Sequence, residues 1–134
     1  MTIPSLAGRS ILIIEDEALI AMDLVECLEE LGLQVVGPLD RLDLALAAAK
    51  SESIDLALLD IDLNGRSAYP VADELRARRI PFAFVTGTDQ ENLQPPYEAH
   101  LSVSKPYSSH GIEQVVTSLL QRINVETSVS AKVD

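Results

Sequence analysis

The fold of this chain is decided by one stretch of its sequence, Leu56-Ala57-Leu58-Leu59-Asp60-Ile61-Asp62-Leu63-Asn64-Gly65. Its apolar run is typical of a strand that is buried on both faces of a parallel sheet, and the run ends abruptly at Asp60. A strand that ends in an acid places that acid at its carboxyl end, where open α/β sheets bind their ligands. Because a charge is costly to bury without a partner or a function, we expect Asp60 to have both.

Similar apolar runs recur along the chain and alternate with helical patterns. Strands are predicted at 10–14, 34–37, 54–60, 81–87 and 101–106. Helices are predicted at 18–31, 42–49, 68–78 and 112–123. Strands that alternate with helices indicate a parallel sheet with helices on both faces, joined by right-handed crossovers. The pattern therefore predicts one doubly wound α/β domain.

The segment between Thr86 and Lys105 departs from this alternation, which asks for a fourth helix there. Pro95 and Pro96 cannot both lie inside a helix, and only Leu93 offers an apolar anchor. We expect this fourth helix to be short or disordered, as a single turn or a mobile loop.

The bulk composition limits the possible functions. The chain has 134 residues and suits one domain, predicted at 9–123, with a loosely held lead-in at 1–8 and a flexible tail at 124–134. The formal net charge of -11 argues against nucleic acid as a partner. No apolar stretch reaches the length of a membrane span, and the N-terminus lacks the pattern of a signal peptide, so we expect a cytoplasmic protein. The single Cys27 excludes an internal disulfide and is expected to lie in the core.

The predicted strand ends carry a distinctive set of side chains. The first strand is followed by Glu15 and Asp16, the third ends at Asp60, the fourth at Thr86 and the fifth near Lys105. Carboxylates about 4 Å apart repel by roughly 4 kcal/mol at a protein-like dielectric, which one lysine cannot offset for three acids. A divalent cation can, and oxygen ligands with room for water suit Mg²⁺. With the cation held by two acids, the third can act as a nucleophile, so the set indicates phosphoryl transfer to an aspartate.

These residues resemble a known family, the receiver domain of bacterial two-component response regulators. The resemblance runs from about Arg9 to Ile123. It is carried by Ile14-Glu15-Asp16-Glu17, Leu59-Asp60, Val85-Thr86-Gly87 and Ser104-Lys105-Pro106. It implies a flavodoxin-like five-stranded sheet with strand order 2-1-3-4-5.

The resemblance also assigns roles to the acids. It implies that Asp60 is the phosphoacceptor and that Glu15, Asp16 and Asp60 hold Mg²⁺ together with the backbone carbonyl of Asp62. The side chain of Asp62 lies where the family tunes the lifetime of the phosphoryl group.

Further roles fall on the neighbouring strands. The resemblance implies that Thr86, Gly87 and Lys105 bind the phosphoryl group, with Thr86 as a switch. Thr88 is a second position that tunes the lifetime, and Pro106 is a candidate for a cis peptide bond after the lysine.

Two departures from the family pattern affect these expectations. The family often has an aromatic switch residue three positions before the lysine, where this chain has Ser102, so an aromatic switch is not expected at that position. Phe82-Ala83-Phe84-Val85-Thr86-Gly87 partly resembles the Phe-Ala-Thr-Gly-x-Tyr signature of a receiver subgroup that pairs with unusual histidine kinases. Outside the motifs, we expect Tyr107 to pack against the sheet edge, and His100 and His110 to be surface residues.

Three functions are compatible with the sequence to different degrees. The favoured one is a single-domain response regulator that accepts a phosphoryl group from a sensor histidine kinase, and then contacts a downstream protein or passes the group on, as a monomer or weak dimer. A phosphatase of the haloacid dehalogenase type would use Asp60-Ile61-Asp62, but that family places this motif on its first strand and needs another acid pair after the lysine. A binding module with the same fold and no phosphorylation would not need the full set of residues.

Overall fold

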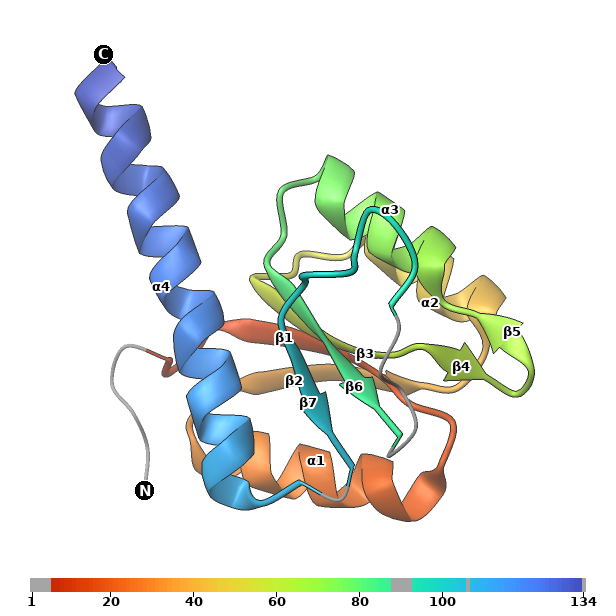
Figure 1. Ribbon diagram of the computed structural model, residues 1–134. Coiled ribbons are helices and arrows are strands. Elements are labelled where there is room, and N and C mark those ends of the chain that lie inside the picture. The colour runs from red at the N-terminus through yellow and green to blue at the C-terminus, as the bar shows by residue number, and fades with distance from the viewer. Residues whose placement is uncertain (1–5, 88–92, 106, 134) are drawn as a thin grey trace.

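The structure is a computed structural model that describes residues 6–87, 93–105 and 107–133, the side chains of residues 123–133 excepted. Its five-stranded parallel sheet has the order β2-β1-β3-β6-β7 (Figure 1). The strands are β1 (Ser10–Ile14), β2 (Gln34–Leu39), β3 (Leu56–Asp60), β6 (Phe82–Thr86) and β7 (Ser102–Ser104). This order confirms the prediction, since the two strands numbered β4 and β5 form a separate hairpin and the remaining five follow 2-1-3-4-5.

The hairpin directly follows the strand that ends in Asp60. It consists of β4 (Asp62–Leu63) and β5 (Arg66–Ser67), which pair antiparallel. Between them, Asn64 has a φ of 52° and Gly65 a φ of 84°. Two central residues with positive φ are typical of the tight turn that joins two strands of right-handed twist, and Asn-Gly suits it best.

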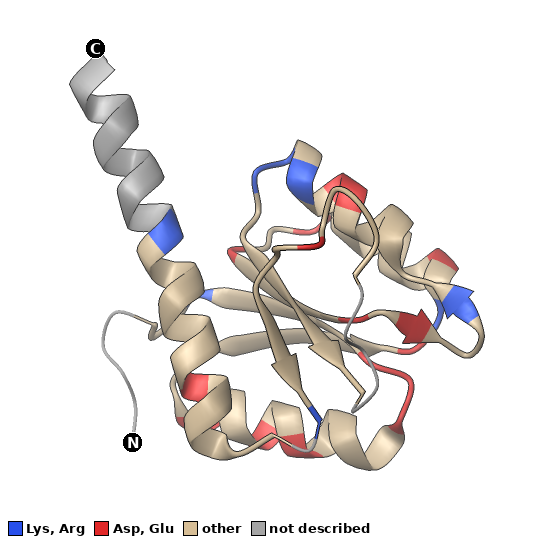
Figure 2. Ribbon diagram, in the orientation of Figure 1, with Lys and Arg blue, Asp and Glu red and all other residues tan. Residues whose placement is uncertain are grey.

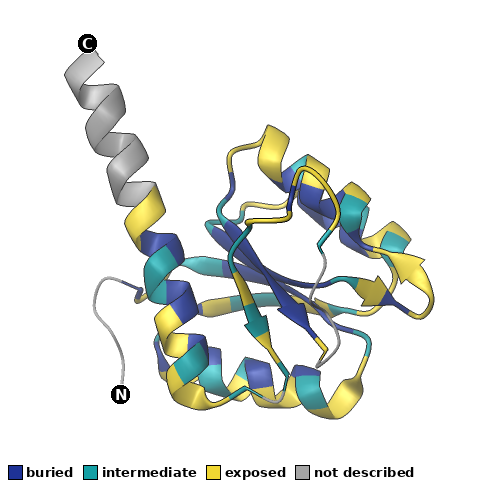
Figure 3. Ribbon diagram, in the orientation of Figure 1, coloured by how far each residue is buried: buried dark blue, intermediate teal, exposed yellow. Residues whose placement is uncertain are grey.

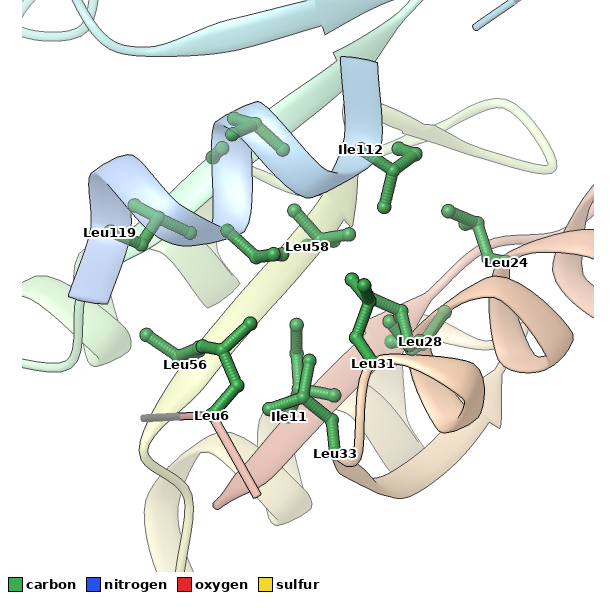
Figure 4. Packing of buried hydrophobic residues seen from close by; sticks show 14 of the residues in the cluster. Leu6, Ile11, Leu24, Leu28, Leu31, Leu33, Leu56, Leu58, Ile112 and Leu119 are labelled. Carbon is green, nitrogen blue, oxygen red and sulfur yellow. The ribbon is translucent and has the colours of Figure 1, made fainter. Parts of the chain in front are cut away.

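Helices cover both faces of the sheet (Figure 1). One face packs on α1 (Ala18–Glu30) and α4 (Ser109–Val133), and the other on α2 (Leu42–Ser51) and α3 (Tyr69–Ala77). Side chains alternate along each strand, so Leu56 and Leu58 join the core under α1 and α4, whereas Ala57 and Leu59 join the core under α2 and α3. Figure 4 shows the first of these cores, where Leu58 lies between side chains of α1 and α4.

Burial rises from the edges of the sheet to its centre (Figure 3). Every residue of β3 and β6 is buried, whereas the edge strand β2 is half-exposed and contains Pro38, which only an edge strand accommodates. Gly37 has a φ of 102°, and a Cβ atom there would lie 2.8 Å from the carbonyl oxygen of Ile13. The close approach of β2 to β1 therefore requires glycine at this position.

The ends of the domain carry contacts and helix that the sequence pattern did not predict. The lead-in was expected to be loose, but Leu6 is fully buried in the core under α1 and α4, and Gly8 donates a backbone hydrogen bond to Gly32. At the other end, α4 continues to Val133 instead of stopping near residue 123, so the backbone of the predicted tail is helical to that point. Polar residues without apolar periodicity gave no signal for this extension.

The segment before β7 contains no helix among its described residues, 93–101, which form turns instead. Residues 88–92, where the remainder of the predicted single turn or loop would fall, lie outside the described part. Within the residues that the structure describes, no helix is both long and apolar enough to cross a membrane.

Candidate functional site

The register of the sheet brings the predicted site residues to one edge. Ile14 of β1 pairs with Leu59 of β3, so Glu15 and Asp60 follow at the same level on adjacent strands. Thr86 of β6 pairs with Ser104 of β7, and Lys105 comes directly after it. The carboxyl ends of all four strands therefore meet where the loops from β1 and β3 carry acidic residues (Figure 2).

Lys105 is the centre of this site. Its Nζ atom lies 3.1 Å from carboxylate oxygens of Glu15, Glu17 and Asp60. Burial alone would lower the pKa of Lys105, but its hydrogen bonds to the three carboxylates, that of Asp60 foremost, outweigh burial and raise it. The lysine is therefore charged at any physiological pH, and it is held by the acceptor candidate before any phosphoryl group is present.

Glu15 and Asp60 are the two buried acids of the site, 2% and 7% exposed. Burial raises the pKa of Glu15 to about 7, helped by its hydrogen bond and charge repulsion with Asp60 and opposed by the backbone N–H of Glu17. The pKa of Asp60 is raised by burial as well, but its hydrogen bonds to Glu15 and Lys105 and the charge of the lysine lower it in turn. The pKa of both acids is therefore raised, and near neutral pH the pair shares a proton.

The acids of this edge form a group that can hold a metal ion. Carboxylate oxygens of Glu15, Asp16, Glu17 and Asp60 all lie within 4.8 Å of one another. Each ionised pair in such a group repels by roughly 3.5 kcal/mol or more at an effective dielectric of about 20. Oε1 of Glu15 is buried and has no hydrogen bond, although Lys105 lies nearby. An all-oxygen donor set with a free lone pair fits Mg²⁺, as the sequence indicated.

Asp62 and Asp16 connect the β4–β5 hairpin to the site through hydrogen bonds. The carboxylate of Asp62 accepts the N–H of Gly65 at 2.9 Å, while its own N–H donates to Asp60 at 3.3 Å. Asp16 accepts the N–H of Asn64 at 2.9 Å. The side chain of Asp62 thus closes its own turn, and its predicted roles in metal binding and phosphoryl lifetime stay predictions.

The predicted phosphoryl-binding residues are only partly described. Thr86 is buried, and its hydroxyl donates a long hydrogen bond of 3.4 Å to the carbonyl oxygen of Val103. Gly87 is exposed, and a Cβ atom there would meet nothing within 4 Å. Thr88 and Pro106 lie outside the described residues, so the lifetime role of the first and the cis bond of the second stay predictions.

Sequence reasoning missed Glu17 as a member of the site. It is the third acid of Glu15-Asp16-Glu17, and its side chain is 61% exposed, yet it reaches Lys105. The signal was present, since three acids in a row follow the first strand, but only two were assigned. The prediction for His100 also needs correction, because this residue is half-buried and stacks on Phe82, whereas His110 is exposed as expected. Tyr107 packs against the core under α1 and α4 and donates to the carbonyl oxygen of Ile20.

Comparison with known proteins identifies the family of the chain. The family model of the response regulator receiver domain matches residues 11–117. The chain therefore belongs to the response regulator receiver domain family of two-component systems, as the motifs indicated.

Three relatives illustrate the range of this similarity. SdrG from Sphingomonas melonis has a solution structure that matches at 38% identity and a TM-score of 0.76, covering 87% of this chain and 98% of SdrG. The transcriptional regulatory protein PdtaR from Mycobacterium tuberculosis is 30% identical over 93% of this chain and 63% of its own length. The phyllosphere-induced regulator PhyR from Methylorubrum extorquens is 36% identical over 84% of this chain, which is 44% of PhyR. The chain thus spans about half to two thirds of these two curated relatives.

Proposed function

We propose that this chain is a magnesium-dependent phosphoacceptor that receives a phosphoryl group on Asp60 from the phosphohistidine of a sensor kinase. The observation that carries the proposal is the environment of Asp60. Its carboxylate lies at the carboxyl end of a central strand, buried, 3.1 Å from the Nζ atom of Lys105 and within a group of four acids. Membership of the receiver family supports the same reaction.

The chemical step follows from these positions. A carboxylate oxygen of Asp60 attacks the phosphorus of the donor, a P–O bond forms as the P–N bond breaks, and the electron pair returns to the imidazole nitrogen. Lys105 already contacts Oδ2 of Asp60, so it can pair with a phosphoryl oxygen after only a small movement. The hydroxyl of Thr86 can donate to a second oxygen once it leaves Val103.

The metal ion belongs to the acidic side of the site. Glu15, Asp16 and Asp60 would hold Mg²⁺, which when bound neutralises charge on the phosphoryl oxygens. The chain itself contributes the orientation: Asp60 is fixed by the N–H of Asp62 and by Lys105, and Glu15 by the N–H of Glu17. Preorganised groups of this kind lower the barrier because they need not reorganise during transfer.

Intact mass spectrometry after incubation with Mg²⁺ and acetyl phosphate, or with a phosphorylated kinase, tests this function. We expect a mass gain of one phosphoryl group that depends on Mg²⁺ and is lost in Asp60→Asn. Asp23→Asn is the matched control, because it makes the same exchange at an exposed position of α1 outside the acidic group and should retain the gain. No mass gain with either donor would instead favour a binding module with the receiver fold.

The partners follow from the same reaction. The donor is a sensor histidine kinase, and the product is read by a downstream protein or by a phosphotransfer protein. Profiling phosphotransfer against purified kinases would identify the donor, with Asp60→Asn as the negative control.

A further inference from the structure

The described residues of the segment before β7, 93–101, are hydrogen-bonded to α3 at two successive positions. The backbone N–H of Gln94 donates to the hydroxyl of Tyr69 at 3.0 Å, and the hydroxyl of Tyr97 donates to Asp73 at 2.7 Å. Tyr69 and Asp73 are four residues apart and lie on one face of α3. Two successive turns of the helix therefore hold residues 93–101 (Figure 1).

Tyr97 is the anchor of this attachment. It is 3% exposed, and its ring stacks on Tyr69 with a centroid distance of 5.8 Å and an interplanar angle of 12°. The same ring makes edge contacts with Phe82, Phe84 and His100 at centroid distances of 5.5–5.9 Å. A tyrosine so buried contributes far more apolar contact than Leu93, the anchor that the sequence suggested.

The anchor lies on the same side of the sheet as the proposed switch. Side chains alternate along β6, so Phe82, Phe84 and Thr86 share the face toward α3. Phe84, which contacts Tyr97, is therefore two residues from Thr86. Thr86 is the last residue of β6 and is hydrogen-bonded to β7 and the residue after it. The hydroxyl of Thr86 donates to the carbonyl oxygen of Val103, and the carbonyl oxygen of Thr86 accepts the N–H of Lys105 at 2.7 Å.

We propose that Tyr97 and Asp73 form a latch that couples the position of Thr86 to residues 93–101, and that the closed latch opposes binding of a phosphoryl group at Asp60. The proposal rests on the proposed function. The closed latch is seen together with a Thr86 hydroxyl that is bonded to Val103. Drawing that hydroxyl toward a phosphoryl oxygen moves the end of β6, and with it the Phe84 ring on which Tyr97 packs. The ring of Tyr97 would thus respond to movement of Thr86, which is the role of the aromatic switch residue that this chain lacks at Ser102.

Coupling of this kind is reciprocal. If binding of a phosphoryl group opens the latch, then a variant with a weaker latch must bind that group with higher affinity. Loss of one buried hydrogen bond with a net value typical of proteins should increase affinity about fivefold, provided that the closed form dominates. A residue with only a structural role would leave affinity unchanged or reduce it.

The test uses beryllofluoride with Mg²⁺, a phosphoryl analogue, and measures its affinity by calorimetry. Tyr97→Phe removes the donor of the hydrogen bond and Asp73→Ala removes its acceptor, and both variants should bind beryllofluoride about fivefold more tightly than the parent. Val116→Ala is the control, because it weakens the core under α4 on the opposite face and should leave affinity within twofold. Amide hydrogen exchange of residues 94–100 should also speed up in the parent when beryllofluoride is added.

Each outcome separates the latch from the function on which it rests. If the parent binds beryllofluoride but neither variant binds more tightly, the latch is refuted and the phosphoacceptor function stands. If the parent does not bind beryllofluoride at all, both proposals fail. If Val116→Ala tightens binding as much as the latch variants do, the effect reports general loss of stability and the latch is again refuted.

Discussion

The buried Glu15 makes a sharp prediction about the pH dependence of Mg²⁺ binding. Its carboxylate has a pKa raised to about 7, chiefly by burial and next by Asp60, and the ion can bind fully only when that proton has left. At pH 8 about nine in ten molecules have lost it, whereas at pH 6 only about one in ten has. The apparent Kd for Mg²⁺ should therefore rise about tenfold from pH 8 to pH 6.

Isothermal titration calorimetry at both pH values measures this change directly. Repeating the titration at pH 6 in two buffers of different ionisation enthalpy should reveal close to one proton released for each ion bound. Glu15→Gln should bind Mg²⁺ more weakly and with a much smaller change between the two pH values. The exposed Glu30→Gln, which makes the same exchange at the end of α1, should behave like the parent. A Kd that changes less than twofold between pH 8 and pH 6 would refute the raised pKa of Glu15.

The same proton affects stability without metal. A carboxyl group with a raised pKa keeps its proton in the folded state between its ordinary value of 4.5 and about 7, while the unfolded chain has lost it. Its contribution to stability therefore falls as the pH rises through this window, and the charged group destabilises the fold above it. Urea unfolding without Mg²⁺ should show a smaller loss of stability from pH 6 to pH 8 in Glu15→Gln than in the parent.

Three further outcomes follow from named contacts. Lys105→Ala leaves Glu15 and Asp60 without their cation and should lower the free energy of unfolding at pH 7.5 by about 3 kcal/mol in urea titrations; an unchanged midpoint would contradict this. Gly37→Ala forces a Cβ atom to within 2.8 Å of the carbonyl oxygen of Ile13 at a φ of 102°, and thermal unfolding should show a loss of about 2 kcal/mol or more, against less than about 1 kcal/mol for Gly87→Ala. Asp62→Asn or Thr88→Ala should change the rate at which the phosphoryl group is lost while Mg²⁺ affinity stays within a few-fold; equal lifetimes in both variants and the parent would remove these residues from that role.

The central strands and the main acids could be predicted because their signal is local. Apolar runs such as 56–59, buried on both faces, have no other stable place than the middle of a parallel sheet. A polar residue that ends such a run must lie at the carboxyl ends of the strands. The positions of Asp60, Thr86 and Lys105 could therefore be predicted from strand order alone. The contacts of the Lys105 side chain could not be predicted in this way, because a lysine has several rotamers and the sequence does not say which acids it reaches.

The features that were missed depend on contacts between distant residues. Tyr97 follows two prolines in a segment without periodicity, and it is buried by Tyr69 and Asp73 of α3 and by aromatic rings of β6. The hairpin at 62–67 is too short to show strand alternation, although Asn64 and Gly65 carried the turn signal. Leu6 stands alone in a polar lead-in, so its place in the core could not be inferred from its neighbours.

Charge balance suits the site to the phosphoryl transfer that we propose. Four acids face one lysine, so the ionised site carries three negative charges, and part of that excess is relieved by the proton on Glu15. Mg²⁺ removes two of the three charges and makes the proton unnecessary. Transfer of a phosphoryl group then converts one carboxylate into a group with more negative charge, which attracts Lys105 more strongly than the exposed Glu17 does. The lysine should therefore exchange Glu17 for the phosphoryl group, and that exchange costs little because the bond it gives up is solvent-screened.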